Sequence, residues 1–245
     1  MKRKNLFVSV AAAFAACALP ATVRAADPVS DPMFAAREAL YGDVPLDALA
    51  ANGNAYPWTS LRAAAAAIKA GHKARAIALL HAVAADPTVA TRAHLEAWSG
   101  LRSLGVIPPT TEAAKLEGVV LDVVTTKGRE TVAAYADTSA VYITEYGQTI
   151  AIPPGVAVRP EIDAVFKAGR VALTKIGNWA GPRPALPFPG GARVALLTAG
   201  GLAFGQGPIH GISRDRLAGP VFTAQTALLM KMIAHANGAP GSGTG

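Results

Sequence analysis

The sequence predicts an α+β protein, in which an N-terminal α-helical subdomain is followed by an antiparallel sheet with helices packed on it. Apolar residues recur at helical spacing up to about residue 105, whereas from residue 118 the pattern becomes that of strands. The second half follows the order strands, helix, strands, helix, which is typical of an α+β layer. We therefore predict a signal peptide at 1–25, a helical subdomain at 26–109, a sheet domain at 110–237 and a flexible tail at 238–245.

The N-terminus has the organisation of a secretory signal peptide. Basic residues at 2–4 precede an apolar run from 6 to 19, and small residues follow as far as Ala25. As a helix the run reaches about 21 Å, against about 30 Å for a bilayer core, so a permanent span is the weaker interpretation. Cleavage after Ala25 predicts a periplasmic or secreted protein. Alternatively, residues 14–17 resemble a lipobox, and a lipid on Cys17 would anchor the chain to the envelope.

Charge and cysteine content exclude several classes of protein. The net charge is +7, but the basic residues 2–4 and Arg24 lie in the leader and the others form no runs. Nucleic-acid binding needs a concentrated basic surface, so we expect no nucleic-acid partner. The single cysteine, Cys17, also lies in the leader. The mature chain would therefore have no disulfides and no cysteine-rich metal cluster, and we expect no cofactor.

The first half contains helical spacing on both sides of Gly71, which predicts two helices joined as a hairpin. The apolar residues that carry this spacing are Leu61, Ala65, Ile68, Ile77, Leu80 and Ala84. A third helix is predicted to begin at Asp86-Pro87 and to end before Gly105. Residues 67–87 are similar to one tetratricopeptide-type hairpin. No second copy occurs at a period of about 34 residues, so the region is a subdomain rather than a repeat array.

The second half alternates between strands and helices. Strands are predicted at 119–125, 131–136, 140–144 and 148–152, a helix at 160–176, a hairpin at 193–198 and 202–206, and a last helix at 221–236. In order, these elements are similar to the roadblock and profilin-like folds. The segments at 57–58, 94–98, 133–137 and 200–208 also resemble an uncharacterised bacterial family with no assigned activity. This resemblance implies no catalytic residue, and it favours treating the two halves as one unit.

The glycine-rich segment at 200–207 is the most distinctive local feature. Bare backbone N–H groups there could cradle a phosphate or carboxylate, and the candidate ligand-binding residues are Gly200, Gly201, Gly205, Gln206 and Gly207. The segment lacks the Lys-Ser/Thr end of a phosphate-binding loop. A hairpin turn with bulges at Gly205 and Gly207 explains the same residues and is the favoured interpretation.

His210 and Ser213 complete the ligand-binding candidates. Together with Asp215 they span only six residues, which cannot readily form the relay of a Ser-His-Asp triad. A polar loop that caps the last helix, with Asp215 paired to Arg214 or Arg216, is the alternative.

The histidines show no short helical pairs of the kind that bind zinc, so no metal site is predicted. His94, beside Glu96 and Trp98, is interpreted as a surface or capping residue. The partner-binding candidates are the three tryptophans, Trp58, Trp98 and Trp179. The last of these could instead seal the core beneath the Pro-rich connection at 181–191.

Taken together, these features predict an exported binding or assembly protein for a protein or peptide partner, without enzymatic activity. The helical hairpin is a shape that often holds peptides or partner helices. The alternative is a small-molecule-binding or hydrolytic enzyme that uses residues 200–213. Membrane association is expected only if Cys17 carries a lipid.

Overall fold

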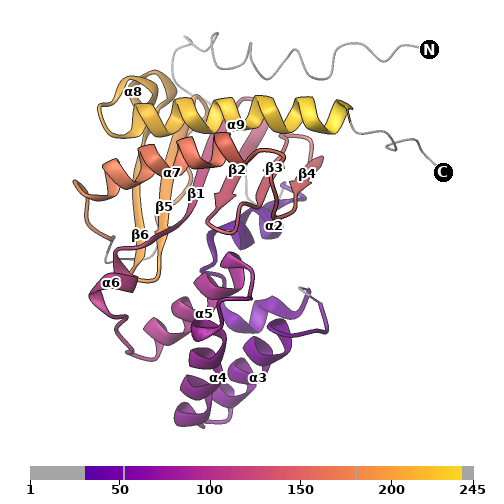
Figure 1. Ribbon diagram of the computed structural model, residues 1–245, viewed down its shortest axis with the longest axis vertical. Helices are drawn as coiled ribbons and strands as arrows, with labels where there is room; N and C mark the ends of the chain where they lie inside the picture. The colour runs from indigo at the N-terminus through magenta and orange to yellow at the C-terminus, as the bar shows by residue number, and fades with distance from the viewer. Residues whose placement is uncertain (1–30, 52, 180, 182, 239–245) are drawn as a thin grey trace, which may run out of the picture.

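The computed structural model describes residues 31–51, 53–179, 181 and 183–238, which form a sheet with helices against both of its faces (Figure 1). The architecture is α+β with an antiparallel sheet, as predicted. The predicted signal peptide, Cys17 and tail residues 239–245 lie outside the described residues.

The sheet has six strands in the described chain, in the order β4-β3-β2-β1-β5-β6, and all neighbours pair antiparallel. The first four strands follow one another as a meander, and the β5–β6 hairpin lies against β1. The strands are β1 (Leu116–Thr125), β2 (Gly128–Tyr135), β3 (Ala140–Ile143), β4 (Thr149–Ile152), β5 (Gly191–Thr198) and β6 (Gly201–Pro208).

Helices α7 (Arg159–Leu173) and α9 (Ala218–Gly238) lie side by side across one face of the sheet (Figure 1). Because side chains alternate along a strand, Val119, Leu121 and Val123 of β1 all reach this face. There they share the largest core with Phe166 of α7 and Leu229 of α9. Among the described residues no helix, α9 included, combines the length and hydropathy that a membrane span requires.

The opposite face of the sheet is covered by the N-terminal half of the chain. Helix α2 (Phe34–Glu38), the short 3₁₀ helix η2 (Ala39–Tyr41) and helix α5 (Thr91–Ser103) supply this cover. Leu40, Tyr41 and Leu95 pack there against Val120 and Tyr135. The helices of the second half, α7 and α9, thus lie on one face of the sheet, and the N-terminal half covers the other. Strands β1 and β5 are buried along nearly their whole length, so both of their faces need a cover.

The remaining helices are η3 (Leu46–Ala51), α3 (Trp58–Lys69), α4 (Lys73–Ala85), α6 (Thr110–Ala113) and α8 (Ile209–Arg214). Helices α3 and α4 form the predicted hairpin, and Gly71 adopts the left-handed conformation between them, with φ of 76°. The third helix begins at Thr91 rather than at Asp86-Pro87. The later start has a local cause. Asp86 Oδ1 accepts hydrogen bonds from the Thr88 N–H and hydroxyl, at 2.8 and 2.6 Å, so Asp86 begins a turn instead of the helix.

Gly42 packs closely against α5, where the N-terminal segment meets that helix. It adopts the left-handed conformation with φ of 62°, directly after η2. A Cβ atom on Gly42 would lie 2.5 Å from Leu95 Cβ, which cannot move without moving α5. Glycine is therefore required here by both conformation and space.

We expect Gly42→Ala to lower the free energy of unfolding by about 2 kcal/mol or more, because left-handed strain and overpacking add. Gly71→Ala is the matched control: its φ is also positive, but a Cβ there meets nothing within 4 Å. That variant should lose only about 1 kcal/mol. Urea denaturation followed by circular dichroism measures both, and equal losses would show that the contact with Leu95 is unimportant.

Candidate functional site

A cavity of about 580 Å³ opens where the helical subdomain meets the start of β1. Its apolar wall includes Ala84 and Ala85 from α4, Trp98 from α5, and Pro109 before α6. His81, Asp86, Lys115 and the three residues considered next give it a polar side. Ligand pockets are commonly of this size and of this mixed character.

The centre of the polar wall is a hydrogen-bonded pair, His94 of α5 and Glu117 of β1. His94 Nδ1 lies 2.6 Å from Glu117 Oε2, and Trp98 Nε1–H donates to His94 Nε2 over 3.3 Å. Because the indole N–H can only donate, Nε2 accepts and the ring proton lies on Nδ1, from which it is donated to the carboxylate. The pair fixes the orientation of the imidazole ring.

Glu117 lines the cavity and lies at an irregularity in its strand. The pairing of β1 with β5 shifts register between Leu116 and Gly118, so Glu117 lies at a β-bulge. Bulges often redirect a side chain beside a functional site. The residue is only 2% exposed, and its Oε1 atom is buried without a hydrogen-bond partner among the described residues. A buried carboxylate oxygen without a partner is costly, so this atom retains the capacity to accept a hydrogen bond or to bind a cation.

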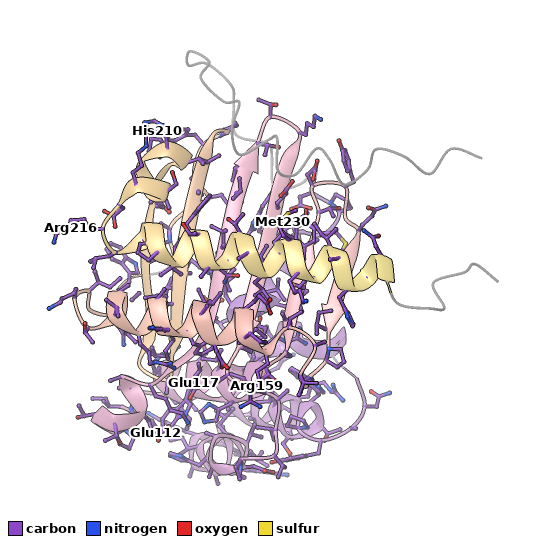
Figure 2. The ribbon with its side chains drawn as sticks, turned by 45° about the horizontal axis from the view of Figure 1, so that its top comes forward. Glu112, Glu117, Arg159, His210, Arg216 and Met230 are labelled. Carbon is purple, nitrogen blue, oxygen red and sulfur yellow. The ribbon has the colours of Figure 1, made fainter. Side chains whose placement is uncertain are left out.

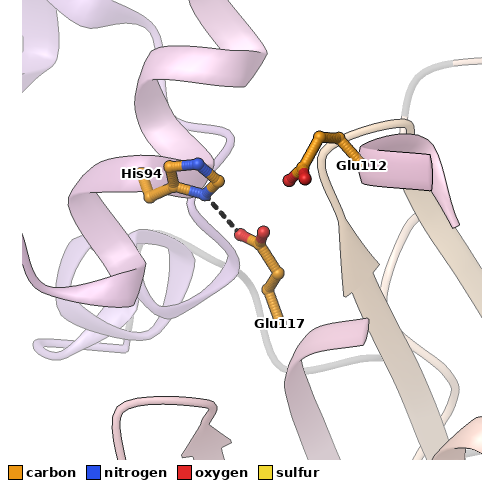
Figure 3. A group of neighbouring side chains, drawn as sticks. All are labelled: His94, Glu112 and Glu117. Atoms are coloured by element: carbon orange, nitrogen blue, oxygen red, sulfur yellow. Dashed lines mark hydrogen bonds and ion pairs between the residues drawn. The ribbon is translucent and has the colours of Figure 1, made fainter. Parts of the chain in front are cut away.

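Glu112 of α6 completes a three-residue cluster with His94 and Glu117, shown in Figure 3. One ring nitrogen and one oxygen from each carboxylate lie within 4.8 Å of one another. His94 and Glu112 are half-buried, whereas Glu117 is buried. The cluster therefore faces solvent through the cavity on one side and the protein interior on the other.

The charge of Glu117 governs the protonation of His94. Burial disfavours the imidazolium form, but the hydrogen bond and negative charge of Glu117 outweigh burial, and the pKa of His94 is raised above its ordinary value. The backbone carbonyl of Ala84 acts in the same direction. A second ring, that of His81, meets Trp98 edge-on at 6.1 Å between centroids and extends the aromatic wall.

The predicted ligand-binding residues lie elsewhere. The β5–β6 turn consists of Ala199 and Gly200, and Gly201 begins β6. A Cβ on Gly200 would lie 2.8 Å from the Ala113 carbonyl oxygen. Strand β6 contains Gly205, Gln206 and Gly207, whose pairing with β5 is regular, so the expected bulges are absent from this described hairpin.

The side chains of Gln206, Ser213 and Asp215 each make a local hydrogen bond in the structure. Gln206 Oε1 accepts a hydrogen bond from Arg193 Nε over 3.0 Å. The Ser213 hydroxyl donates to the backbone oxygen of His210 over 3.3 Å, within α8. Asp215 accepts the N–H groups of Leu217 and Ala218 at the start of α9, each over 2.8 Å, rather than a bond from the neighbouring arginines.

The two regions are well separated in the molecule. Figure 2 shows Glu112 and Glu117 beside the helical subdomain and His210 near the opposite end of the sheet. A ligand-binding role for residues 200–213 stays a prediction.

The three tryptophans lie in different surroundings. Trp98 is buried and lines the cavity. Trp58 begins α3, with the Arg92 guanidinium 5.4 Å from its ring centre. Trp179 is 50% exposed and meets Phe204 edge-on at 5.5 Å, so it does not seal the core as the alternative interpretation supposed.

The interpretation of His94 as a surface or capping residue was wrong, because His94 belongs to the cavity cluster. Sequence reasoning also missed Glu112 and Glu117. The cluster draws one residue from each of α5, α6 and β1, so no short motif marks it. The nearest sequence signal is Pro108-Pro109, which separates α5 from α6, the helix that contains Glu112.

Comparison of the chain with protein-family models, with curated proteins and with solved structures found no match. The resemblances to a bacterial family, to a tetratricopeptide hairpin and to roadblock and profilin-like folds therefore stay predictions.

Proposed function

We propose that the chain is a binding protein whose ligand enters the cavity between the helical subdomain and the sheet. The observation that carries this proposal is the buried Oε1 atom of Glu117, which lies in the cavity wall without a partner among the described residues. A bound ligand would supply the electropositive group that this oxygen needs, either an N–H donor or a cation.

The rest of the cavity supports a ligand with an apolar part as well. Trp98, Ala84 and Ala85 offer a surface on which a methylene chain or a small ring can pack. A peptide side chain or a small amine has this combination of groups, which agrees with the peptide partner that the sequence predicts. Export to the envelope, predicted from residues 1–25, is part of the proposal and rests on the sequence alone.

The indole N–H signals of the tryptophans allow a direct test by NMR. The probe is a panel of dipeptides that covers every class of side chain, added to the ¹⁵N-labelled chain. We expect at least one basic dipeptide to shift the Trp98 signal in a saturable way and to leave Trp58 and Trp179 unchanged. Single Trp→Phe variants assign the three signals.

We expect Ala85→Phe to weaken that binding about tenfold or more, because the ring would fill the apolar side of the cavity. Ala82→Phe is the matched control, since Ala82 is also exposed on α4 but does not line the cavity. It should leave the binding curve unchanged. If no dipeptide shifts the Trp98 signal, or if Ala85→Phe binds as the unmodified chain does, the proposed function is wrong.

A further inference from the structure

We propose that His94, Glu112 and Glu117 form a binding site for a divalent transition-metal ion, with zinc as the best fit. The inference deepens the proposed function and rests on it, since it names a cation as the group that the cavity takes. One imidazole nitrogen and two carboxylate oxygens are a donor set that Zn²⁺ accepts, and it leaves further positions open. The site is distinct from the glycine-rich segment.

The first support is geometric. The three donor atoms lie within 4.8 Å of one another and come from three separate elements. Zinc ligands lie about 2.0–2.2 Å from the ion, so donors around one ion are about 3.3–3.5 Å apart. The 2.6 Å between His94 Nδ1 and Glu117 Oε2 would therefore widen on binding, and the half-buried Glu112 of α6 would adjust to the same spacing.

The second support is the unpartnered oxygen of Glu117. The side chain is nearly completely buried and lines the cavity, yet Oε1 has no hydrogen-bond partner among the described residues. A cation beside it would satisfy this atom. It would also offset the repulsion that arises when the second carboxylate, Glu112, is brought close to the first.

The open positions of the ion would face the cavity. A water molecule or a donor atom of the ligand can occupy them, because the cluster lines the same cavity as Trp98 and Ala85. The ion would then form the polar end of the binding site and the aromatic wall its apolar end.

Isothermal titration of the tag-free, metal-free full chain with zinc chloride tests the site. We expect one ion per chain with a Kd of about 1 μM or below. Glu112→Gln should weaken binding at least about tenfold, as should His94→Gln. Asp86→Asn is the control, because Asp86 lines the same cavity and carries the same charge but lies outside the cluster, so its Kd should change less than about twofold.

Cobalt(II) gives a second readout, since visible absorption bands report ligand geometry. We expect bands of four- or five-coordinate cobalt in the unmodified chain and their loss in Glu112→Gln, whose circular dichroism should stay unchanged. Absence of stoichiometric zinc binding, or equal affinities for Glu112→Gln and Asp86→Asn, would overturn the inference. A chain that binds a dipeptide but no zinc would retain the proposed function and lose the metal site, whereas a chain that binds neither would lose both.

Discussion

Replacing Asp122 with asparagine should lower the free energy of unfolding by about 3–5 kcal/mol, the cost of removing one partner from a buried ion pair. Asp122 is completely buried on β1. Its carboxylate accepts two bonds from Arg129, each 2.9 Å long, a third from Thr131 over 2.8 Å, and a fourth from the Tyr41 hydroxyl. The variant keeps the size of the side chain but leaves the Arg129 guanidinium with less compensating charge.

The same network attaches the N-terminal segment to the sheet. Arg129 also donates to Glu38 of α2 over 2.8 Å, and Glu38 pairs with Arg183. Neighbouring Arg37 is buried and donates to the backbone oxygens of Ile143 and Thr144 over 3.0 and 2.7 Å. Loss of Asp122 should therefore loosen the cover over this face of the sheet as well as lower global stability.

Asp163→Asn is the control for this prediction, because Asp163 also faces an arginine but both side chains are exposed on α7. An exposed pair is worth about 0–1 kcal/mol, so this variant should scarcely change stability. Urea denaturation with circular dichroism compares the two. A second measurement adds Arg129→Met to Asp122→Asn, and the double variant should lose less than the sum of the single losses. A loss below about 1 kcal/mol for Asp122→Asn would contradict the role assigned to the network.

The local elements of the fold could be predicted from the sequence. The expected helix at 160–176 corresponds to α7, and the expected hairpin at 193–206 corresponds to β5 and β6, because such elements depend on periodicity and turn residues that are close in sequence. The pairing of β1 with β5 was not predictable in this way. It joins segments about 70 residues apart, and no local pattern encodes a contact of that range.

The candidate site could not be predicted for the same reason. His94 and Glu117 are 23 residues apart and meet only because α5 packs against β1. Glu117 follows no motif, and the bulge at which it lies appears only when β1 pairs with β5. The charged network at Asp122 could not be predicted either. A charged residue within an apolar strand is interpreted as solvent-facing unless the segment that covers it is known.

Stability should also depend on pH through Glu96, a buried residue of α5 whose carboxyl faces the turn after η2. Burial raises its pKa to about 8, and the charge of Asp43 acts in the same direction, opposed by the Val44 N–H and by Arg92 and Arg183. A carboxyl whose pKa is higher in the folded chain than its usual 4.5 binds its proton more tightly when folded. Its contribution is therefore complete below pH 4.5, falls as the pH rises from 4.5 to about 8, and is constant above that.

The slope across this window is about 1.4 kcal/mol per pH unit for one such group. Glu96→Gln imitates the protonated carboxyl and should remove that slope, so the variant should become more stable than the unmodified chain by several kcal/mol near pH 8. Urea denaturation at a series of pH values measures the difference between the two chains at each pH. Titration of Glu130, whose pKa is also raised to about 8, then cancels, since it is common to both chains. A difference that stays constant with pH would show that Glu96 is ionised in the folded protein, and that the arginines near it outweigh its burial.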